Sequence, residues 1–412
     1  MFVFLYTAGV ACYHAAIRLI SPFHAKAAAW LEGRRGLWEK IERFERGEGK
    51  VAWVHVASLG EFEQGRPLVE MIRERLPGTR VVLTFFSPSG HEACKRYGGA
   101  DAVFYLPPES PGNARRFVHL VRPDAAIFVK YEFWYHYLHA LHVARVPTYL
   151  ISARFRPGQP FFRPWGVLHR RMLALFTGIR VQEEESARLL RSVGISRVEV
   201  TGDTRFDRVL AIAGQARPVE RVERLRGEGP LIVCGSTWPA DEEIICRYMR
   251  GRGRGCRWVI VPHEVGEARA RALVERCGEG TGRLSGDALE ESTCRVLVVD
   301  RVGLLSSIYR YATVAYVGGG FGRGIHNTLE AAVYGIPVVF GPAYRKFGEA
   351  VELVRRGGGF SIRDAEGFAA LMESLLSRPG RIARAGQRAK ALVEEGAGAT
   401  EKTFNMIRGD LS

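Results

Sequence analysis

The chain has 412 residues, of which 47% are apolar, and carries a formal net charge of +15. This length exceeds what one hydrophobic core usually serves and predicts two domains. Because the sequence has neither zinc-finger spacing nor a basic patch interleaved with aromatics, the charge favours an anionic membrane surface or a phosphorylated lipid as partner rather than nucleic acid. The seven cysteines form no C-x-x-C pair, so neither a zinc site nor a disulfide framework is indicated, and we expect a reducing cytosol.

The first predicted element is an apolar helix. Residues 1–20, MFVFLYTAGVACYHAAIRLI, are apolar over about the roughly 20 residues that cross a bilayer, although His14 and Arg18 interrupt the run. No cleavage site indicates a signal peptide, and the basic cluster at 26–40 favours a cytoplasmic location for the rest of the chain. We expect residues 1–22 to form a membrane anchor or an interfacial helix, the alternative being a buried first helix of the globular body.

Beyond this helix, apolar runs bounded by turns alternate with helical patterns. Such alternation predicts parallel sheets with right-handed crossovers, and two series of runs predict two doubly wound domains. We place the division in the strand-poor stretch 211–229 and expect domains over 23–212 and 213–412, with the last helix able to pack back on the first domain. The expected strands are 51–57, 79–86, 100–106, 123–130, 147–153, 178–182 and 198–202, then 231–236, 258–263, 295–300, 314–320 and 337–341.

Glu61 stands where the first of these strands gives way to a helix. The run VAWVHVA ends before Gly60, and apolar residues at helical spacing begin at Phe62. Glu61 is therefore predicted on the first turn of a helix at the carboxyl end of a strand, the edge where open α/β sheets bind ligands. An acid at this position also stabilises the helix through its macrodipole, so a purely structural role stays open.

Two later strand ends in the first half also carry polar candidates. Glu132 follows the strand at 123–130 beside Trp134, which suits sugar binding or, alternatively, a helix cap beside a half-buried tryptophan. Arg205, in GDTRFD, follows the strand at 198–202 and is placed to meet an anion, unless it is a plain surface arginine.

The glycine-rich block AYVGGGFGRGIHNTLEAAVYGIPVVFGP at 315–342 is the densest signal in the second half. Glycines let a backbone approach a phosphate closely, and free amides in the first turn of a helix bind anions. Asn327 would cap such a helix with Glu330 as its capping-box partner, or Glu330 would accept hydrogen bonds from ribose hydroxyls. The block fits neither the dinucleotide fingerprint nor a Walker motif, which disfavours a nicotinamide cofactor.

Polar residues also follow two other strands of the second half. Ser236 and Thr237 come after one strand and His263 after the next, so all three are predicted at the same edge of the sheet. A lone histidine such as His263 can equally be structural.

Five of these stretches, taken in order, resemble a known family. They are ASLGE at 57–61, YEFW at 131–134, ISARF at 151–155, VTGDTRFD at 200–207 and GGGFGRGIHNTLEAAVYGIPVVFGP at 318–342. Together they are similar to the 3-deoxy-D-manno-octulosonic acid (Kdo) transferases of lipopolysaccharide biosynthesis, from about residue 25 to the last helices. The spelling of the glycine-rich block is most similar to versions in Bacteroidetes-like bacteria.

The resemblance implies the α/β GT-B fold, with two Rossmann-like doubly wound domains facing a cleft and an N-terminal membrane-associated helix. It implies an inverting glycosyltransferase that needs no metal or other cofactor. Such an enzyme moves Kdo from CMP-Kdo to the tetraacylated lipid A precursor (lipid IV-A), at the cytoplasmic face of the inner membrane.

The resemblance also assigns roles to residues of this sequence. Glu61 would be the general base, and Glu132 and Arg205 would be linked with the transition state. The CMP contacts would carry over to Pro262, His263, Gly303, Leu304, Leu305, Asn327, Thr328, Leu329 and Glu330.

The sequence departs from the family pattern at several of these positions. The family often has arginine at His263, glutamate at Leu304, an acid at Lys130, proline at Thr328 and lysine at Arg205. Backbone contacts at His263 and Leu304 could survive, but their side-chain roles stay open. Arg205 keeps the charge of a lysine with a different geometry.

Two other functions stay open on the sequence alone. Sugar-nucleotide epimerases and glycogen phosphorylase share the GT-B fold, and a fold does not name a reaction. The first alternative is therefore an epimerase or hydrolase acting on a sugar nucleotide. The second is a catalytically silent lipid-binding homologue.

Overall fold

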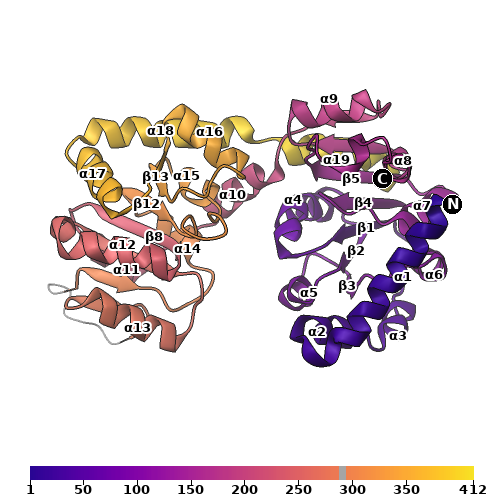
Figure 1. The fold of residues 1–412 in the computed structure, drawn as a ribbon, viewed down its shortest axis with the longest axis horizontal. Coiled ribbons are helices and arrows are strands. Elements are labelled where there is room, and N and C mark those ends of the chain that lie inside the picture. Colours follow the sequence, from indigo (N-terminus) through magenta and orange to yellow (C-terminus); the bar gives the residue numbers. More distant parts are fainter. Residues whose placement is uncertain (287–293) are drawn as a thin grey trace. The chain divides into compact units, whose positions relative to one another are not determined.

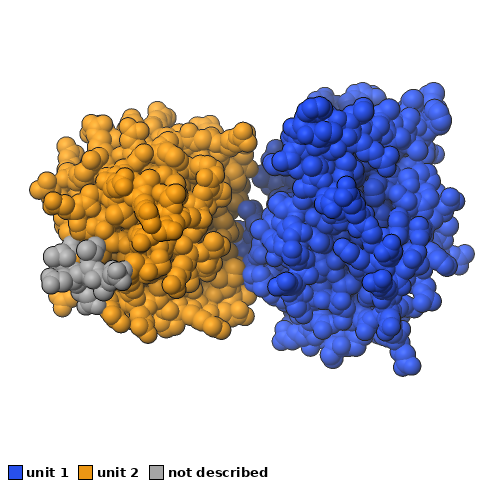
Figure 2. All heavy atoms as spheres, turned by 90° about the horizontal axis from the view of Figure 1, so that it is seen from below, with its two compact units in different colours: residues 1–208, 397–412 blue, residues 209–396 orange. Residues whose placement is uncertain are grey.

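The structure, a computed structural model, describes residues 1–286 and 294–412. The chain divides into two compact units (Figure 1, Figure 2): unit 1 comprises Met1–Arg208 and Ala397–Ser412, and unit 2 comprises Val209–Gly396. The chain leaves unit 1 within helix α10 (Thr204–Gly214) and returns after helix α18 (Pro379–Gly396). The division thus falls inside a continuous helix, and the expected boundary at 212/213 lies in the last turn of that helix.

Unit 1 is built on a parallel sheet with the strand order β3-β2-β1-β4-β5-β6-β7. Every residue of β1, β4 and β5 is buried, as expected for central parallel strands covered on both faces. The strands are β1 (Val51–Val56), β2 (Arg80–Phe85), β3 (Ala102–Tyr105), β4 (Ala125–Val129), β5 (Thr148–Ala153), β6 (Gly178–Val181) and β7 (Val198–Val200).

Successive residues of β1 pack into different cores on the two faces of this sheet. Trp53 contributes to the core that includes residues of α6 and α7, whereas Val54 belongs to the core that includes residues of α4 and α19. The helices of unit 1 are α1 (Phe2–Ile20), α2 (Ala25–Glu32), α3 (Leu37–Glu42), α4 (Leu59–Arg75), α5 (Pro88–Cys94), α6 (Pro111–Val121), α7 (Tyr135–Val143), α8 (Val167–Ala174), α9 (Glu184–Ser192), the first part of α10 and α19 (Ala399–Leu411), with short 3-10 turns at Ser21–Phe23 and Pro160–Phe162.

Unit 2 is built on a second parallel sheet, with the order β10-β11-β9-β8-β12-β13-β14. Its strands are β8 (Leu231–Thr237), β9 (Arg257–Pro262), β10 (Thr281–Arg283), β11 (Val296–Val298), β12 (Val314–Val317), β13 (Val338–Phe340) and β14 (Gly359–Ser361). Its helices are α11 (Glu220–Arg226), α12 (Pro239–Arg250), α13 (Glu267–Cys277), α14 (Leu305–Tyr309), α15 (Leu329–Ala332), α16 (Gly348–Arg356), α17 (Ala365–Leu376) and α18, with a 3-10 turn at Arg252–Gly255.

All twelve strands expected from the sequence are present, and the α/β class with two doubly wound sheets is confirmed. Strands β10 and β14 were not predicted. Each has three residues, includes a glycine and lies at one edge of the second sheet, so neither presents the continuous apolar run that marks a central strand.

Helix α1 lies along the surface of unit 1 (Figure 1). Within the described residues, Phe2–Phe23 is the segment long and apolar enough to cross a membrane. Tyr6 Oη donates to Glu109 Oε2 at 2.7 Å, and Ile17 is buried against α2. The opposite face is open, with Phe4 and Leu19 each 75% exposed. The helix is therefore docked on unit 1 but not enclosed by it, which differs from the alternative of a buried first helix.

The last helix, α19, packs on unit 1 against α4. Its side chains Phe404, Ile407 and Leu411 belong to the same core as the inner face of α4. Asp207 accepts hydrogen bonds from the backbone of Gly398 and Thr400, at 2.6 and 2.7 Å, and so fixes the point at which the chain re-enters unit 1.

Candidate functional site

A buried polar network lies below the carboxyl edge of the first sheet. His55, one residue before the end of β1, places Nε2 3.0 Å from Oε2 of Glu132 and Nδ1 2.9 Å from Oγ1 of Thr84. Trp53 Nε1 also donates to Thr84 Oγ1, at 2.8 Å. When this hydroxyl accepts from Trp53 and donates its own proton to Nδ1, the Nε2–H of a neutral His55 points at Glu132. Trp134 Nε1 donates to the same carboxylate oxygen at 2.6 Å, so two ring N–H groups orient Glu132.

Glu61 lies on the first turn of α4, where the sequence places it. Its side chain is half-buried and accepts a hydrogen bond from the hydroxyl of Ser58, the N-cap residue. Partial burial raises the pKa of the Tyr131 phenol, and the nearby Glu61 carboxylate adds to that rise. Glu61 is thus within electrostatic reach of the loop that carries Glu132. Both acids follow neighbouring strands, because β1 pairs with β4.

Arg205 is held by a buried acid two residues before it. Its Nε and Nη2 donate to Asp203 Oδ2 at 2.9 and 2.7 Å, and Asp203 is only 7% exposed. Thr204, which lies between Asp203 and Arg205 in the sequence, donates its hydroxyl proton to the backbone oxygen of Gln64 in α4 at 2.6 Å. Although β7 is at the far edge of the sheet, this contact brings the start of α10 back to the helix that carries Glu61.

Unit 1 therefore gathers the three residues that the resemblance implicates at one edge. Lys130, between β4 and Glu132, has a φ of 69°, in the left-handed region that is uncommon for residues other than glycine. Its backbone N–H is fixed by the oxygen of Ile151, at 2.9 Å. Such a strained backbone conformation persists only where surrounding contacts hold it in place. Here it sets the direction in which the chain leaves β4 toward Glu132.

In unit 2, His263 belongs to a stack of three aromatic rings. His263 follows β9, and its ring is 4.7 Å from that of Trp238 and 4.3 Å from that of His326, with interplanar angles of 27° and 24°. Trp238 Nε1 donates to His326 Nε2 at 3.0 Å. That bond requires an unprotonated Nε2. It agrees with the pKa of His326, which burial, followed by repulsion from His263, holds below the ordinary value.

The predicted capping box at Asn327 is not formed. The helix begins two residues later, as the single turn α15, and its N-cap is Thr328 without a side-chain cap bond. Asn327 Oδ1 accepts from the backbone N–H of Leu329 at 3.1 Å, and Asn327 Nδ2 donates to Glu330 Oε1 at 3.0 Å. Asn327 therefore makes a local turn and orients the Glu330 carboxylate. Because α15 spans one turn, it carries little of the macrodipole expected of a longer helix.

The remaining predicted positions of unit 2 lie around the same part of the sheet. Pro262 ends β9, and Gly303, with a φ of 87°, and Leu304 come just before α14, which begins at Leu305. Helix α14 packs against β8 and α15. Burial and then the nearby Glu330 carboxylate raise the pKa of Tyr309 in α14, which places Glu330 beside this helix.

The glycines after β12 are required by neighbouring backbone. A Cβ at Gly318 would lie 2.3 Å from the backbone oxygen of Ser236, and one at Gly320 would lie 2.6 Å from the backbone of Gly341. The buried Asp241 fixes this turn, since its Oδ2 accepts from the N–H groups of both Gly319 and Trp238 at 2.9 Å. We predicted that these glycines let a phosphate approach the backbone. The structure gives another reason for glycine at Gly318 and Gly320, because protein backbone already fills the space that a side chain would occupy.

Sequence reasoning missed His55, Asp203, Trp238, Asp241 and His326. A signal existed for His55, because a histidine inside the buried run VAWVHVA must find polar partners. For Trp238 and His326 no local signal exists, since 88 positions separate them in the chain.

Comparisons with known proteins agree with this architecture. The family model described as 3-Deoxy-D-manno-octulosonic-acid transferase (kdotransferase) matches residues 31–208. Among solved structures, UDP-GlcNAc 2-epimerase from Neisseria meningitidis has a TM-score of 0.58 at 15% identity, covering 84% of this chain and 99% of its own. MurG from Acinetobacter baumannii has a TM-score of 0.57 at 12% identity, covering 87% and 99%. These structures show a GT-B-like fold.

Curated relatives extend the match over most of the chain. The 3-deoxy-D-manno-octulosonic acid transferase of Aquifex aeolicus is 29% identical over 79% of this chain and 86% of its own length. The enzyme of the same name from Bordetella pertussis is 30% identical over 92% of this chain and 94% of its own. The chain therefore belongs to the 3-deoxy-D-manno-octulosonic acid transferase family of glycosyltransferases.

Proposed function

We propose that this protein transfers Kdo from CMP-Kdo to the tetraacylated lipid A precursor, lipid IV-A, with inversion at the anomeric carbon and without a metal ion. The observation that carries the proposal is the position of Glu61. It is a half-buried carboxylate at the carboxyl edge of the first sheet, on a helix that packs against β4, the strand before Glu132, and accepts a hydrogen bond from Thr204, the residue before Arg205. Family membership supports the donor and the reaction type.

Glu61 is proposed as the general base. A sugar hydroxyl is a poor nucleophile, so a carboxylate within hydrogen-bond reach must take its proton as the anomeric carbon is attacked. A carboxylate half open to solvent can accept that proton and release it after the reaction. Its bond to the Ser58 hydroxyl fixes the side chain at the helix start.

Glu132 and Arg205 are proposed to act on the transition state. Glu132 is held by His55 and Trp134 and presents an oriented negative charge to the sugar ring. Arg205 is oriented by Asp203 and would stabilise the negative charge that develops on the departing phosphate. Since α15 offers only one turn, we assign less of this stabilisation to a helix N-terminus than the sequence suggested.

Unit 2 is proposed to bind the cytidylate of the donor. The exposed face of the stack formed by Trp238, His263 and His326 would receive the planar base. The Glu330 carboxylate, oriented by Asn327, would accept hydrogen bonds from the ribose, and backbone groups at Pro262, Gly303, Leu304, Leu305, Thr328 and Leu329 would complete the contacts. This assignment keeps His263 in the site although arginine is frequent there in the family.

We further propose that the enzyme works at the cytoplasmic face of the inner membrane, with α1 lying in the membrane interface. The docking of Tyr6 on Glu109 and of Ile17 on α2 supports an interfacial helix over a spanning one, because a spanning helix would break both contacts. Replacing Phe4 and Leu19 by glutamate should lower sedimentation with anionic vesicles. The matched change Trp165→Glu, at a residue 63% exposed on the same unit, should not.

The reaction is tested by incubating the purified protein with CMP-Kdo and tetraacylated lipid A precursor in the presence of a chelator, and weighing the lipid by mass spectrometry. A gain of one or more Kdo units supports the proposal, and the number of units fixes the stoichiometry. An unshifted lipid mass alongside an active control enzyme contradicts it. Free Kdo or an epimerised sugar in that case would indicate a sugar-nucleotide hydrolase or epimerase, and intact CMP-Kdo a silent lipid-binding homologue.

A further inference from the structure

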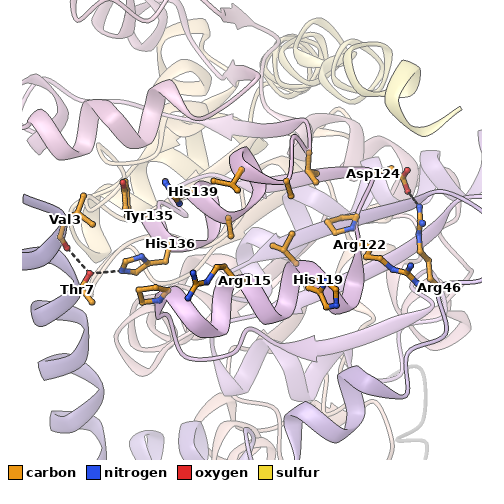
Figure 3. A pocket seen from close by; sticks show the side chains of 17 residues that line it. Val3, Thr7, Arg46, Arg115, His119, Arg122, Asp124, Tyr135, His136 and His139 are labelled. Carbon is orange, nitrogen blue, oxygen red and sulfur yellow. Dashed lines mark hydrogen bonds and ion pairs between the residues drawn. The ribbon is translucent and has the colours of Figure 1, made fainter.

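A long groove runs over the surface of unit 1 between α6 and α7. Its volume is about 830 Å³, within the roughly 300–1,000 Å³ typical of small-molecule sites. Figure 3 shows Val3 and Thr7 of α1 at one end and Arg46 with Asp124 at the other. We call it the α6/α7 groove. Thr7 Oγ1 lies 3.0 Å from His136 Nε2, so the N-terminal part of α1 is fixed where it borders the groove.

Apolar side chains make up much of the groove lining. Val118 of α6 and Ala140 of α7 are buried, and Val146 is half-buried after the end of α7. At the surface, Val143 at the end of α7 is 68% exposed and adds to this apolar lining. A ligand that follows the groove would therefore cover hydrocarbon surface along its length.

The charged side chains of the groove are predominantly cationic. Arg115 and Arg122, both exposed, come from α6 and the residue after it, and neither forms an ion pair within residues 1–286 and 294–412. The acid that lines the groove, Asp124, is already bound by Arg46 at 2.7 Å and Lys50 at 3.3 Å. The groove therefore complements a ligand that joins an apolar chain to an anionic group.

The groove is also continuous with the apolar face of α1. Val3 borders the groove, and Phe4 and Leu5 beside it are 75% and 58% exposed. An interfacial α1 would thus place one end of the groove at the level of lipid chains.

We propose that the α6/α7 groove binds one acyl chain of an anionic bilayer phospholipid, whose phosphate is met by the cations of α6, Arg115 and Arg122. The groove begins beside Tyr135 and His136, which follow the loop of Glu132, and runs to the amino edge of the sheet, where Arg122 and Val146 lie shortly before β4 and β5. Because Arg122 is at the end of the groove away from Glu61, we favour a bulk lipid over the acyl chains of the acceptor. The inference does not depend on the transfer reaction.

The test uses the full chain bound to vesicles that contain phosphatidylglycerol with a photoactivatable diazirine at the end of one acyl chain. After irradiation, adducts are mapped by mass spectrometry, and the yield on residues 111–146 is divided by the yield on α1 in the same sample. This ratio separates occupancy of the groove from general membrane attachment. We expect adducts on both α6 and α7, and a ratio about fivefold lower when the same probe is carried by phosphatidylcholine.

Variants then identify the determinants. Val143→Glu should lower the ratio by about fivefold or more, since it places a charge in the apolar mouth, while Val302→Glu, at a residue 83% exposed in unit 2, should leave it unchanged. The pair Arg115→Ser and Arg122→Ser should remove the preference for phosphatidylglycerol, and the exposed Arg188→Ser on α9 should not. Because these positions are exposed, thermal unfolding should be unchanged in each variant.

Three outcomes would overturn the proposal. The first is labelling confined to α1. The second is a ratio that neither Val143→Glu nor the double arginine variant alters. The third is displacement of the groove label by unlabelled tetraacylated lipid A precursor but not by unlabelled phosphatidylglycerol, which would assign the groove to the acceptor.

Discussion

His55 Nε2 lies 3.0 Å from Glu132 Oε2, and both side chains are buried at the edge of the sheet where the proposed acceptor site lies. The histidine is itself fixed from behind by Thr84 and Trp53. Glu132 therefore does not have to be ordered by substrate, which reduces the entropy cost of reaching the reactive geometry.

Replacing His55 by leucine should both destabilise unit 1 and impair transfer. The change leaves Thr84 and Glu132 short of a buried partner, which costs about 1–3 kcal/mol. We expect kcat to fall more than KM rises, because Glu132 loses its orientation rather than its identity. Urea unfolding and steady-state kinetics provide the two measurements. Thr148→Val, which removes a buried hydroxyl of β5 outside this network, is the control for lost stability, and an equal loss of kcat in both variants would argue against positioning through His55.

Glu61→Gln should reduce transfer by about 100-fold or more, because the amide cannot take a proton from the acceptor hydroxyl. Binding of CMP, measured by calorimetry, should be unchanged. Glu70→Gln, on the same helix, removes a carboxylate that pairs with Arg66 and should retain activity. Activity of Glu61→Gln within a few-fold of the unsubstituted protein would restrict Glu61 to a helix-capping role.

Trp238→Ala should weaken CMP binding. Loss of one base-stacking contact costs about 1–3 kcal/mol, or roughly 5- to 150-fold in Kd. Isothermal titration with CMP measures the effect. Trp165→Ala, at an exposed tryptophan of unit 1, is the matched control. An unaltered Kd would show that the stack of rings serves the fold of unit 2 and not the nucleotide.

Glu109 should make stability depend on pH between about 5 and 7. Burial raises the pKa of Glu109 from 4.5 to about 7, and the hydrogen bonds from Tyr6 and His136 only partly oppose this. Over this range the folded chain holds a proton that the unfolded chain releases. Its contribution is therefore complete below pH 4.5 and is lost as pH rises through 7, by at most about 3 kcal/mol.

The corresponding experiment compares the free energy of unfolding of the unsubstituted protein with that of Glu109→Gln across this pH range. As pH rises, the free energy of unfolding of the unsubstituted protein should fall relative to that of Glu109→Gln. Glu185→Gln, on the exposed face of α9, should show no such trend. Parallel pH profiles for the Glu109 variant and the unsubstituted protein would contradict the assignment.

Elements whose residues carry a continuous apolar pattern could be predicted from the sequence. Every residue of Val51–Val56 and Ala125–Val129 is buried, so both strands appear in the sequence as nearly continuous apolar runs. The pattern fails where a strand is short and contains no apolar side chains, as at Thr281–Arg283. It also fails where a turn competes with a helix, as at Asn327, whose side chain bonds to Leu329 and Glu330 and so delays the helix start.

The positions of Glu61, Glu132 and Arg205 at strand ends were predictable, because strand ends in parallel sheets share one edge. Their partners were not. The contact of Asp203 with Arg205 is local, but the choice of His55 for Glu132 depends on how β1 and β4 pair in register. The stacking of Trp238 on His263 depends in the same way on the pairing of β8 with β9. Sequence patterns identify the edge, whereas tertiary packing selects the neighbours.

The return of α19 to unit 1 affects how the protein can be made. During synthesis the ribosome must finish all of unit 2 before Phe404, Ile407 and Leu411 can cover the inner face of α4. Until then the nascent first half exposes an apolar surface, and chains with such exposed surface aggregate readily. An interfacial α1 would hold this surface near lipid. Isolated expression of unit 1 would accordingly require residues 397–412 to be joined directly to the end of its first segment.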